Sequence, residues 1–202
     1  IPFYGELGSV NPVFVTEGAA ASRPEAIVSE FIESFTLGAG QFCTKPGVLL
    51  VPRDSAIVER LADAELPKAA PLLNPRIQEG YVKTLDELAS QSSVSVLRSG
   101  DADADLGADP PGPTLLTTAA ADLLADLREG RDEVFRECFG PTTLVASYDN
   151  EDELLAVGQF NPRGHSGGMF AGGLAGGDAG GLAGGVGESV GESPPAFEPV
   201  TV

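Results

Sequence analysis

Three short stretches of the chain carry side chains suited to covalent and acid–base chemistry. YGELGSVNP holds Glu6, GQFCTKPG holds Cys43, and ECFGP holds Glu137. A thiolate is a good nucleophile toward a carbonyl carbon, and a carboxylate nearby can activate the water that cleaves the resulting thioester. Glu6 and Cys43 lie far apart in the sequence, so only folding can bring them together. These residue types therefore allow covalent thiol catalysis.

Each stretch taken alone also has a plainer interpretation. A cysteine beside glycines is most often a buried structural thiol, a glutamate in GELG is most often a solvated turn residue, and ECFGP is compatible with a turn that enters a strand. The two cysteines could form one disulfide, but reduced thiols in a cytoplasmic protein are the better interpretation. His165 is the only histidine and has no second ligand nearby in the sequence, so no metal site is expected.

The elements that must position these residues alternate between strands and helices. Ile27, Phe31 and Phe35 recur at helical spacing, and GVLLVP has the length and composition of a buried strand. The patterns predict strands over 11–15, 47–52, 93–100, 114–118 and 142–149. They predict helices over 23–38, 54–66, 74–90, 119–130 and 150–158. This alternation predicts an α/β domain with a largely parallel sheet and flanking helices.

Finer expectations concern the ends and the regularity of these helices. Asp54 or Ser55 is expected to cap the second helix, and a loose turn is expected near Gly80 in the third. The stretch 119–130 is either a short helix or irregular. Asn150 is expected to cap the last helix, with Glu153 completing the capping box.

Taken together and in this order, the three stretches resemble the aldehyde dehydrogenase superfamily. Its nucleophile signature, Gly-Gln-x-Cys-Thr, is complete at residues 40–44, and its Glu-x-Phe-Gly-Pro signature is complete at 137–141. Its Glu-Leu-Gly-Gly signature stands at residues 6–9 with Ser9 in place of the last glycine. The resemblance extends over roughly residues 1–158. The variants GQFCTKPG and ECFGP resemble the branch that oxidises 2-oxoglutarate semialdehyde (2,5-dioxopentanoate).

The resemblance implies a role for each of these residues. Cys43 corresponds to the nucleophile that forms a thiohemiacetal and then a thioester, and Glu6 to the general base that activates the deacylating water. Glu137 corresponds to the carboxylate that binds the nicotinamide ribose, and Phe139 to the aromatic ring beside the nicotinamide. Cys138 is expected to serve packing. The implied cofactor is NAD or NADP, the implied substrate is a small aldehyde, and full-length relatives are expected to be homo-oligomers.

Composition and chain ends complete the expectations. A net charge of −18 argues against nucleic-acid binding, and no apolar run is long enough to span a membrane. We expect the end of a cofactor-binding domain over 1–20, a partial catalytic domain over 21–158, and a disordered Gly/Pro-rich tail over 159–202. No Gly-x-Gly-x-x-Gly fingerprint follows a predicted strand. Met169 is the only methionine, so the simplest interpretation is a fragment of a longer protein.

Two hypotheses about function follow from the sequence. In the first, the chain is the catalytic part of an NAD(P)-dependent aldehyde dehydrogenase in the cytoplasm, and is inactive as an isolated fragment. In the second, it is an inactive remnant or a non-enzymatic α/β module that retains the motifs. The intact Glu6, Cys43 and Glu137 favour the first hypothesis.

Overall fold

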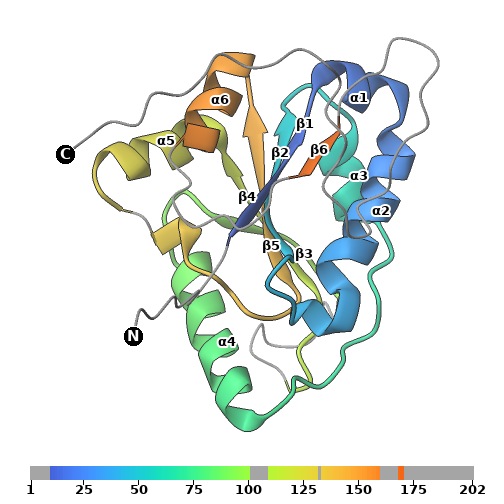
Figure 1. The fold of residues 1–202 in the computed structure, drawn as a ribbon, viewed down its shortest axis with the longest axis vertical. Coiled ribbons are helices and arrows are strands. Elements are labelled where there is room, and N and C mark those ends of the chain that lie inside the picture. Colours follow the sequence, from blue (N-terminus) through green and yellow to red (C-terminus); the bar gives the residue numbers. More distant parts are fainter. Residues whose placement is uncertain (1–9, 101–108, 132, 160–167, 171–202) are drawn as a thin grey trace, which may run out of the picture.

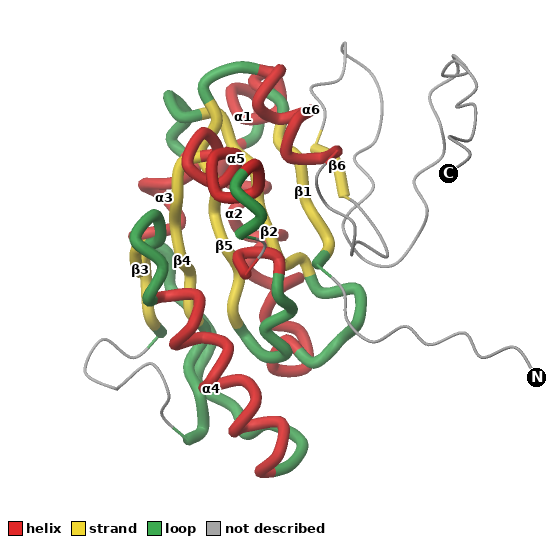
Figure 2. The backbone as a smooth tube through the Cα atoms, turned by 90° about the vertical axis from the view of Figure 1, so that its left-hand side faces the viewer, coloured by secondary structure: helices red, strands yellow, loops and turns green. Residues whose placement is uncertain are grey.

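A six-stranded sheet forms the centre of the molecule. The computed structural model describes residues 10–100, 109–131, 133–159 and 168–170 (Figure 1). Its strands are β1 (Asn11–Val15), β2 (Pro46–Pro52), β3 (Ser95–Ser99), β4 (Thr114–Ala119), β5 (Thr142–Tyr148) and β6 (Gly168–Phe170). The strand order is β3-β4-β5-β2-β1-β6, which Figure 2 shows from the side of the molecule. Every neighbouring pair is parallel except β3 and β4, so the predicted largely parallel sheet is confirmed.

Helices cover both faces of this sheet. On one face lie α1 (Glu17–Ser22), α2 (Pro24–Thr36) and α3 (Ile57–Asp63), and on the other lie α4 (Pro75–Ala89), α5 (Ala120–Arg128) and α6 (Glu151–Gln159) (Figure 1). Two 3-10 turns, η1 (Leu37–Gly40) and η2 (Glu133–Phe135), complete the described elements.

Alternate residues of the central strands supply the two halves of the core. In β2, Val48 and Leu50 belong to the cluster under α4, α5 and α6, whereas Leu49 and Val51 belong to the cluster under α1, α2 and α3. All four side chains are fully buried. A strand that is covered on both faces explains the continuous apolar run GVLLV, which is typical of parallel sheets.

The helices differ from the sequence-based expectations at several points. The helix expected over 54–66 spans only Ile57–Asp63, and neither Asp54 nor Ser55 caps it, because its N-cap is Ala56 without a side-chain hydrogen bond. The loose turn expected at Gly80 is wrong, since α4 is continuous. The stretch 119–130 is helical as α5. The cap of α6 is confirmed, because the Asn150 side chain accepts a hydrogen bond from the Glu153 amide at 3.1 Å.

Two further elements were not predicted. The six residues of α1 are too short to show a helical repeat, although the Thr16 side chain caps them. β6 pairs in parallel with β1, from Val13–Gly168 to Val15–Phe170, within the region expected to be a disordered tail. The rest of that tail lies outside the described residues, apart from Gln159 at the end of α6.

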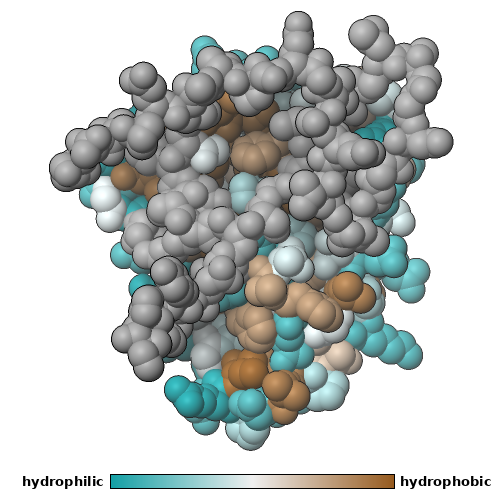
Figure 3. Space-filling view, viewed as in Figure 1, coloured by the Kyte–Doolittle hydropathy of each residue, from teal (hydrophilic) through white to brown (hydrophobic). Residues whose placement is uncertain are grey.

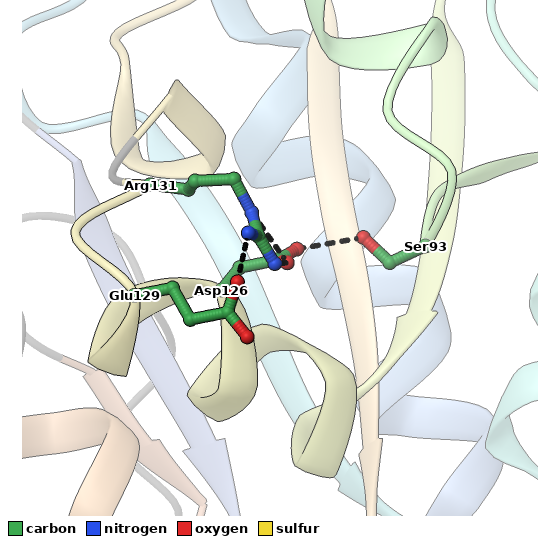
Figure 4. A network of polar contacts seen from close by, with 4 residues as sticks. All are labelled: Ser93, Asp126, Glu129 and Arg131. Carbon is green, nitrogen blue, oxygen red and sulfur yellow. Dashed lines mark hydrogen bonds and ion pairs between the residues drawn. The ribbon is translucent and has the colours of Figure 1, made fainter.

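A polar network fixes the chain after α5. The Arg131 guanidinium donates to Asp126 at 2.6 Å and also contacts Glu129, while the Ser93 hydroxyl donates to the other Asp126 oxygen at 2.9 Å (Figure 4). The hydrogen bond from Arg131 holds the pKa of Asp126 below its ordinary value. The network therefore joins the loop before β3 to the segment that leads toward Glu137.

Candidate active site

The three sequence motifs precede three neighbouring strands. Glu6 precedes β1 in the sequence but lies outside the described residues, Cys43 lies on the loop before β2, and Glu137 precedes β5. Because β5, β2 and β1 are adjacent and parallel, their amino ends lie at the same edge of the sheet, the lower edge in Figure 2. The topology thus brings the segments of Cys43 and Glu137 together, and it places the start of β1 beside them.

The Cys43 loop begins with an unusual backbone turn. Gly38, Ala39 and Gly40 all have left-handed dihedral angles, with φ of 56°, 55° and 68°. Such angles suit glycine and strain other residues, so this run explains why the helix α2 must end in a glycine-rich turn. Cys43 follows the turn, is exposed and is not part of a disulfide. The plainer interpretation of Cys43 as a buried structural thiol is therefore wrong.

Asn11 fastens this loop to β1. Its side-chain amide donates to the Cys43 carbonyl at 2.8 Å and to the Lys45 carbonyl at 3.0 Å. Asn11 is only 2% exposed, and its bond to the Lys45 carbonyl is buried while its bond to the Cys43 carbonyl is partly buried. Because the two carbonyls flank Thr44, the single amide fixes the backbone on both sides of that residue and next to the thiol.

Lys45 connects the loop to the Glu137 segment. Its ammonium group donates to the carbonyl oxygens of Thr142, Cys138 and Gly140 at 2.6, 2.7 and 3.2 Å. The residue is buried, and burial lowers its pKa. The three acceptors match the three N–H donors of an ammonium group. A neutral amine would supply one donor fewer.

The two segments also meet through direct backbone contact. A Cβ atom at Gly40 would lie 2.2 Å from the Gly140 carbonyl oxygen, and a Cβ atom at Gly140 would lie 2.3 Å from the Tyr81 ring. Glycine is needed at both positions because nothing larger fits between the loop, the segment and α4. The Tyr81 hydroxyl is 2.7 Å from the Thr142 hydroxyl oxygen, and this hydrogen bond holds α4 against the start of β5.

The remaining residues of the Glu137 motif differ in exposure. Glu137 and Phe139 are half-buried, whereas Cys138 between them is only 6% exposed. Burial raises the pKa of the Cys138 thiol to about 11, which keeps it protonated and unreactive near neutral pH. The expectation that Cys138 serves packing is confirmed. The alternating exposure leaves Glu137 and Phe139 partly accessible to solvent on either side of the buried thiol.

Exposed apolar side chains occur on the chain around Cys43 and on the loop before α4. Phe42 is 48% exposed, and Leu37 and Leu73 on neighbouring loops are exposed as well. The Gln41 side chain accepts a hydrogen bond from the Leu73 amide at 2.8 Å and so joins the loop before α4 to the Cys43 loop. Figure 3 shows apolar side chains among polar ones on the lower part of the molecule, around α4 and the chain that precedes it.

Sequence reasoning missed two residues that hold the site, Asn11 and Lys45. A polar residue at the first position of the apolar strand NPVFV is the only signal for Asn11. No sequence signal marked Lys45, because a lysine beside Pro-Gly normally indicates a solvated turn and is almost never fully buried. Both residues act through backbone carbonyls, which a sequence pattern does not reveal.

The described residues contain neither a candidate metal site nor a candidate membrane-spanning helix. No group of three or more histidine, cysteine, aspartate or glutamate side chains is arranged to hold a metal ion in this part of the chain. Within the same residues, no helix has both the length and the apolar character needed to cross a membrane.

Comparison with known proteins identifies a family. The model described as the aldehyde dehydrogenase family matches residues 1–175, which extends the similarity beyond the expected limit at residue 158. The chain is 34% identical over 164 residues to an alpha-ketoglutaric semialdehyde dehydrogenase of Acinetobacter baylyi, covering 77% of this chain and 29% of that protein. A second protein of this kind, from Azospirillum brasilense, is 34% identical over 162 residues, covering 78% of this chain and 29% of its own length.

Solved structures show the same fold at lower sequence identity. PnpE in complex with nicotinamide adenine dinucleotide has a TM-score of 0.65 and 20% identity, over 84% of this chain and 36% of that one. A lactaldehyde dehydrogenase has a TM-score of 0.57 and 20% identity, over 81% of this chain and 39% of that one. The chain thus spans about three tenths of the length of the curated relatives named above.

Proposed function

The chain belongs to the aldehyde dehydrogenase family, and from this premise we propose that Cys43 is the nucleophile in the NAD(P)-dependent oxidation of an aldehyde to a carboxylic acid. The observation that carries the proposal is the junction of the Cys43 loop with the Glu137 segment at one edge of the sheet. Of the two thiols, Cys43 is exposed at this junction and Cys138 is buried.

The proposed reaction uses the residues of this chain in two stages. The Cys43 thiolate adds to the aldehyde carbon, and the new alkoxide is stabilised by nearby N–H donors. A bound NAD(P)⁺ would supply the acceptor for the hydride that leaves this carbon, and Cys43 would then carry a thioester. Glu6 then takes a proton from water, which attacks the thioester and releases the acid and the free thiol.

The residues present fit one end of a nicotinamide cofactor. We propose that the Glu137 carboxylate accepts hydrogen bonds from the ribose hydroxyls. We propose that the Phe139 ring packs against the apolar edge of the nicotinamide. Their half-buried positions beside the Cys43 loop support this assignment. No sequence fingerprint for the pyrophosphate is present, so we assign that part of the cofactor to residues outside this chain.

The substrate we propose is 2-oxoglutarate semialdehyde. The names of the two relatives at 34% identity support this choice, as does the resemblance of GQFCTKPG to the branch that oxidises 2-oxoglutarate semialdehyde. We place the reaction in the cytoplasm, where the thiols of Cys43 and Cys138 remain reduced, since neither forms a disulfide. Assembly into homo-oligomers stays a prediction.

A chimeric enzyme tests the proposed function. The segment of the Acinetobacter baylyi relative that matches this chain is replaced by the corresponding residues of this chain, so that the relative supplies the remaining length. Formation of NADH or NADPH with the semialdehyde is then followed by absorbance. We expect turnover that is lost in the Cys43→Ala chimera. A folded chimera that forms no reduced cofactor would favour an inactive remnant instead.

A further inference from the structure

Lys45 lies at the edge of the sheet where β1, β2 and β5 begin. It directly precedes β2, its backbone carbonyl accepts a hydrogen bond from Asn11 of β1, and its ammonium group donates to three carbonyls at and before the start of β5. Among the bonds named above, only those of Lys45 join one residue both to β1 and to the chain at the start of β5. The side chain therefore fills the centre of the junction that carries the proposed site.

Two observations exclude a direct role for Lys45 in binding a substrate. Lys45 is 7% exposed, and its three donors already have acceptors within the chain. The cavity that it shares with Glu137 and Thr143 has a volume of about 20 Å³, enough for one water molecule but not for an aldehyde. Lys45 can influence the chemistry only through the residues that it holds.

We propose that Lys45 is a positioning residue, whose ammonium group holds the Cys43 loop and the Glu137–Phe139 segment in the one arrangement that makes Cys43 reactive. The proposal rests on the proposed function of Cys43. Only the protonated form supplies three donors, so loss of the proton leaves one carbonyl without its partner and turns the amine lone pair toward it. The arrangement should then relax at alkaline pH.

The charged and titratable groups around Lys45 come from several elements. Burial is the largest effect and lowers the pKa of Lys45 below its ordinary value, whereas the charges of Cys138 and Glu137 act in the opposite direction. Arg136 borders the same small cavity, and Tyr81 of α4 reaches Thr142 from the other side. Of these groups, Cys138 also titrates in the alkaline range and must be removed in a control.

The test uses the 202-residue chain and needs no cofactor. 4-Nitrophenyl acetate acetylates the Cys43 thiolate, which forms a thioester while 4-nitrophenolate leaves, and the single-turnover rate is measured from pH 7 to 11. In a Cys138→Ala background the rate should fall toward alkaline pH as Lys45 loses its proton. In Lys45→Met the rate should be lower by roughly ten- to a hundredfold at neutral pH, and the alkaline fall should be absent.

Matched variants separate positioning from simple structural support. Lys83→Met removes an exposed ammonium group from α4 and should leave the rate unchanged. Ethylammonium chloride should restore the rate of Lys45→Ala, whereas sodium chloride at equal ionic strength should not. Cys138 should remain protected from iodoacetamide in Lys45→Met, as expected for a folded chain.

Three results would overturn the proposal. One is a Lys45→Met rate within twofold of the parent chain, and another is a rate loss that accompanies exposure of Cys138 and does not respond to ethylammonium. The third applies if Lys45→Met does not fold: the acylation rate of the parent chain then shows no fall at alkaline pH. Failure of the proposed function has a different signature, because the Cys43→Ala chain would then release nitrophenolate as fast as the parent.

Discussion

At the scale of single residues, the two thiols of this chain show how position decides reactivity. Cys43 and Cys138 both lie in short glycine-containing motifs, and the sequence alone allowed either to be buried. The structure leaves Cys43 exposed after a left-handed turn and buries Cys138 between two half-buried neighbours. Accessibility therefore assigns different roles to two residues of the same type.

Glu6 lies outside the described residues, so its role is tested through kinetics. Glu6→Gln keeps the size of the side chain but removes the base that we assign to the deacylating water. With 4-nitrophenyl acetate, the initial burst of nitrophenolate should persist while the steady rate falls on the order of a hundredfold. Glu17→Gln, on α1, is the matched control and should leave both phases unchanged. Loss of the burst in Glu6→Gln would instead indicate a role in acylation or positioning.

The Cys138 thiol should make the fold sensitive to alkali. Its pKa is raised to about 11 in the folded chain from an ordinary 9.0, because burial disfavours the thiolate. The stabilisation from this thiol is fully present below pH 9 and is lost as pH rises through 11, and it amounts to roughly 3 kcal/mol at most. Urea unfolding at pH 8 and 11 should therefore show a smaller loss of stability for Cys138→Ala than for the parent. Equal losses would show that the thiol does not titrate as described.

At the scale of elements, most strands and helices could be predicted because their patterns are local. The buried run of β2, the helical spacing in α2 and the Asn150 cap each depend on residues close in sequence. The ends of α3, the short helix α1 and the pairing of β6 with β1 depend on tertiary contacts instead. For the same reason the motif residues were found from the sequence, while Asn11 and Lys45, which act across strands, were not.

The close contact between the Cys43 loop and the Glu137 segment can be tested at Gly40. Gly40→Ala places a Cβ atom 2.2 Å from the Gly140 carbonyl oxygen at a φ of 68°, so the two segments must separate. We expect a loss of roughly 1–3 kcal/mol in the free energy of unfolding, together with slower acylation of Cys43. The control is Gly80→Ala in α4, where nothing lies within 4 Å, and it should stabilise the chain by about 0.5–1 kcal/mol. Equal stabilities of the two variants would contradict the close approach.

At the scale of the whole molecule, a three-layer α/β/α arrangement brings distant motifs to one edge of the sheet. The amino ends of β1, β2 and β5 gather segments that are up to about a hundred residues apart, as the hydrogen bond between Lys45 and Thr142 illustrates, with a separation of 97 residues. The chain nevertheless spans 29% of the length of its alpha-ketoglutaric semialdehyde dehydrogenase relatives. We therefore propose that the assembled edge supplies the thiol chemistry and one end of the cofactor site, and not the whole site.

The 202-residue chain alone is expected to show no sustained aldehyde oxidation. Hydride transfer requires the nicotinamide within about 3–3.5 Å of the reacting carbon. Glu137 and Phe139 can hold only one end of the cofactor, so the dinucleotide has little reason to remain in that geometry. The chain is mixed with NAD or NADP and the semialdehyde, and absorbance of the reduced cofactor is followed. Turnover above that of Cys43→Ala would show that the 202-residue chain holds the cofactor through more residues than Glu137 and Phe139.

The most direct measurement is the identity of the residue that the 202-residue chain acylates. After brief reaction with 4-nitrophenyl acetate at neutral pH, the chain is digested under acidic conditions and its peptides are analysed by mass spectrometry. We expect one acetyl group, on the peptide that contains Cys43, with the same result for Cys138→Ala and no thioester for Cys43→Ala. Acetylation of Cys138 instead, or a burst that survives in Cys43→Ala, would contradict the central claim that Cys43 is the nucleophile.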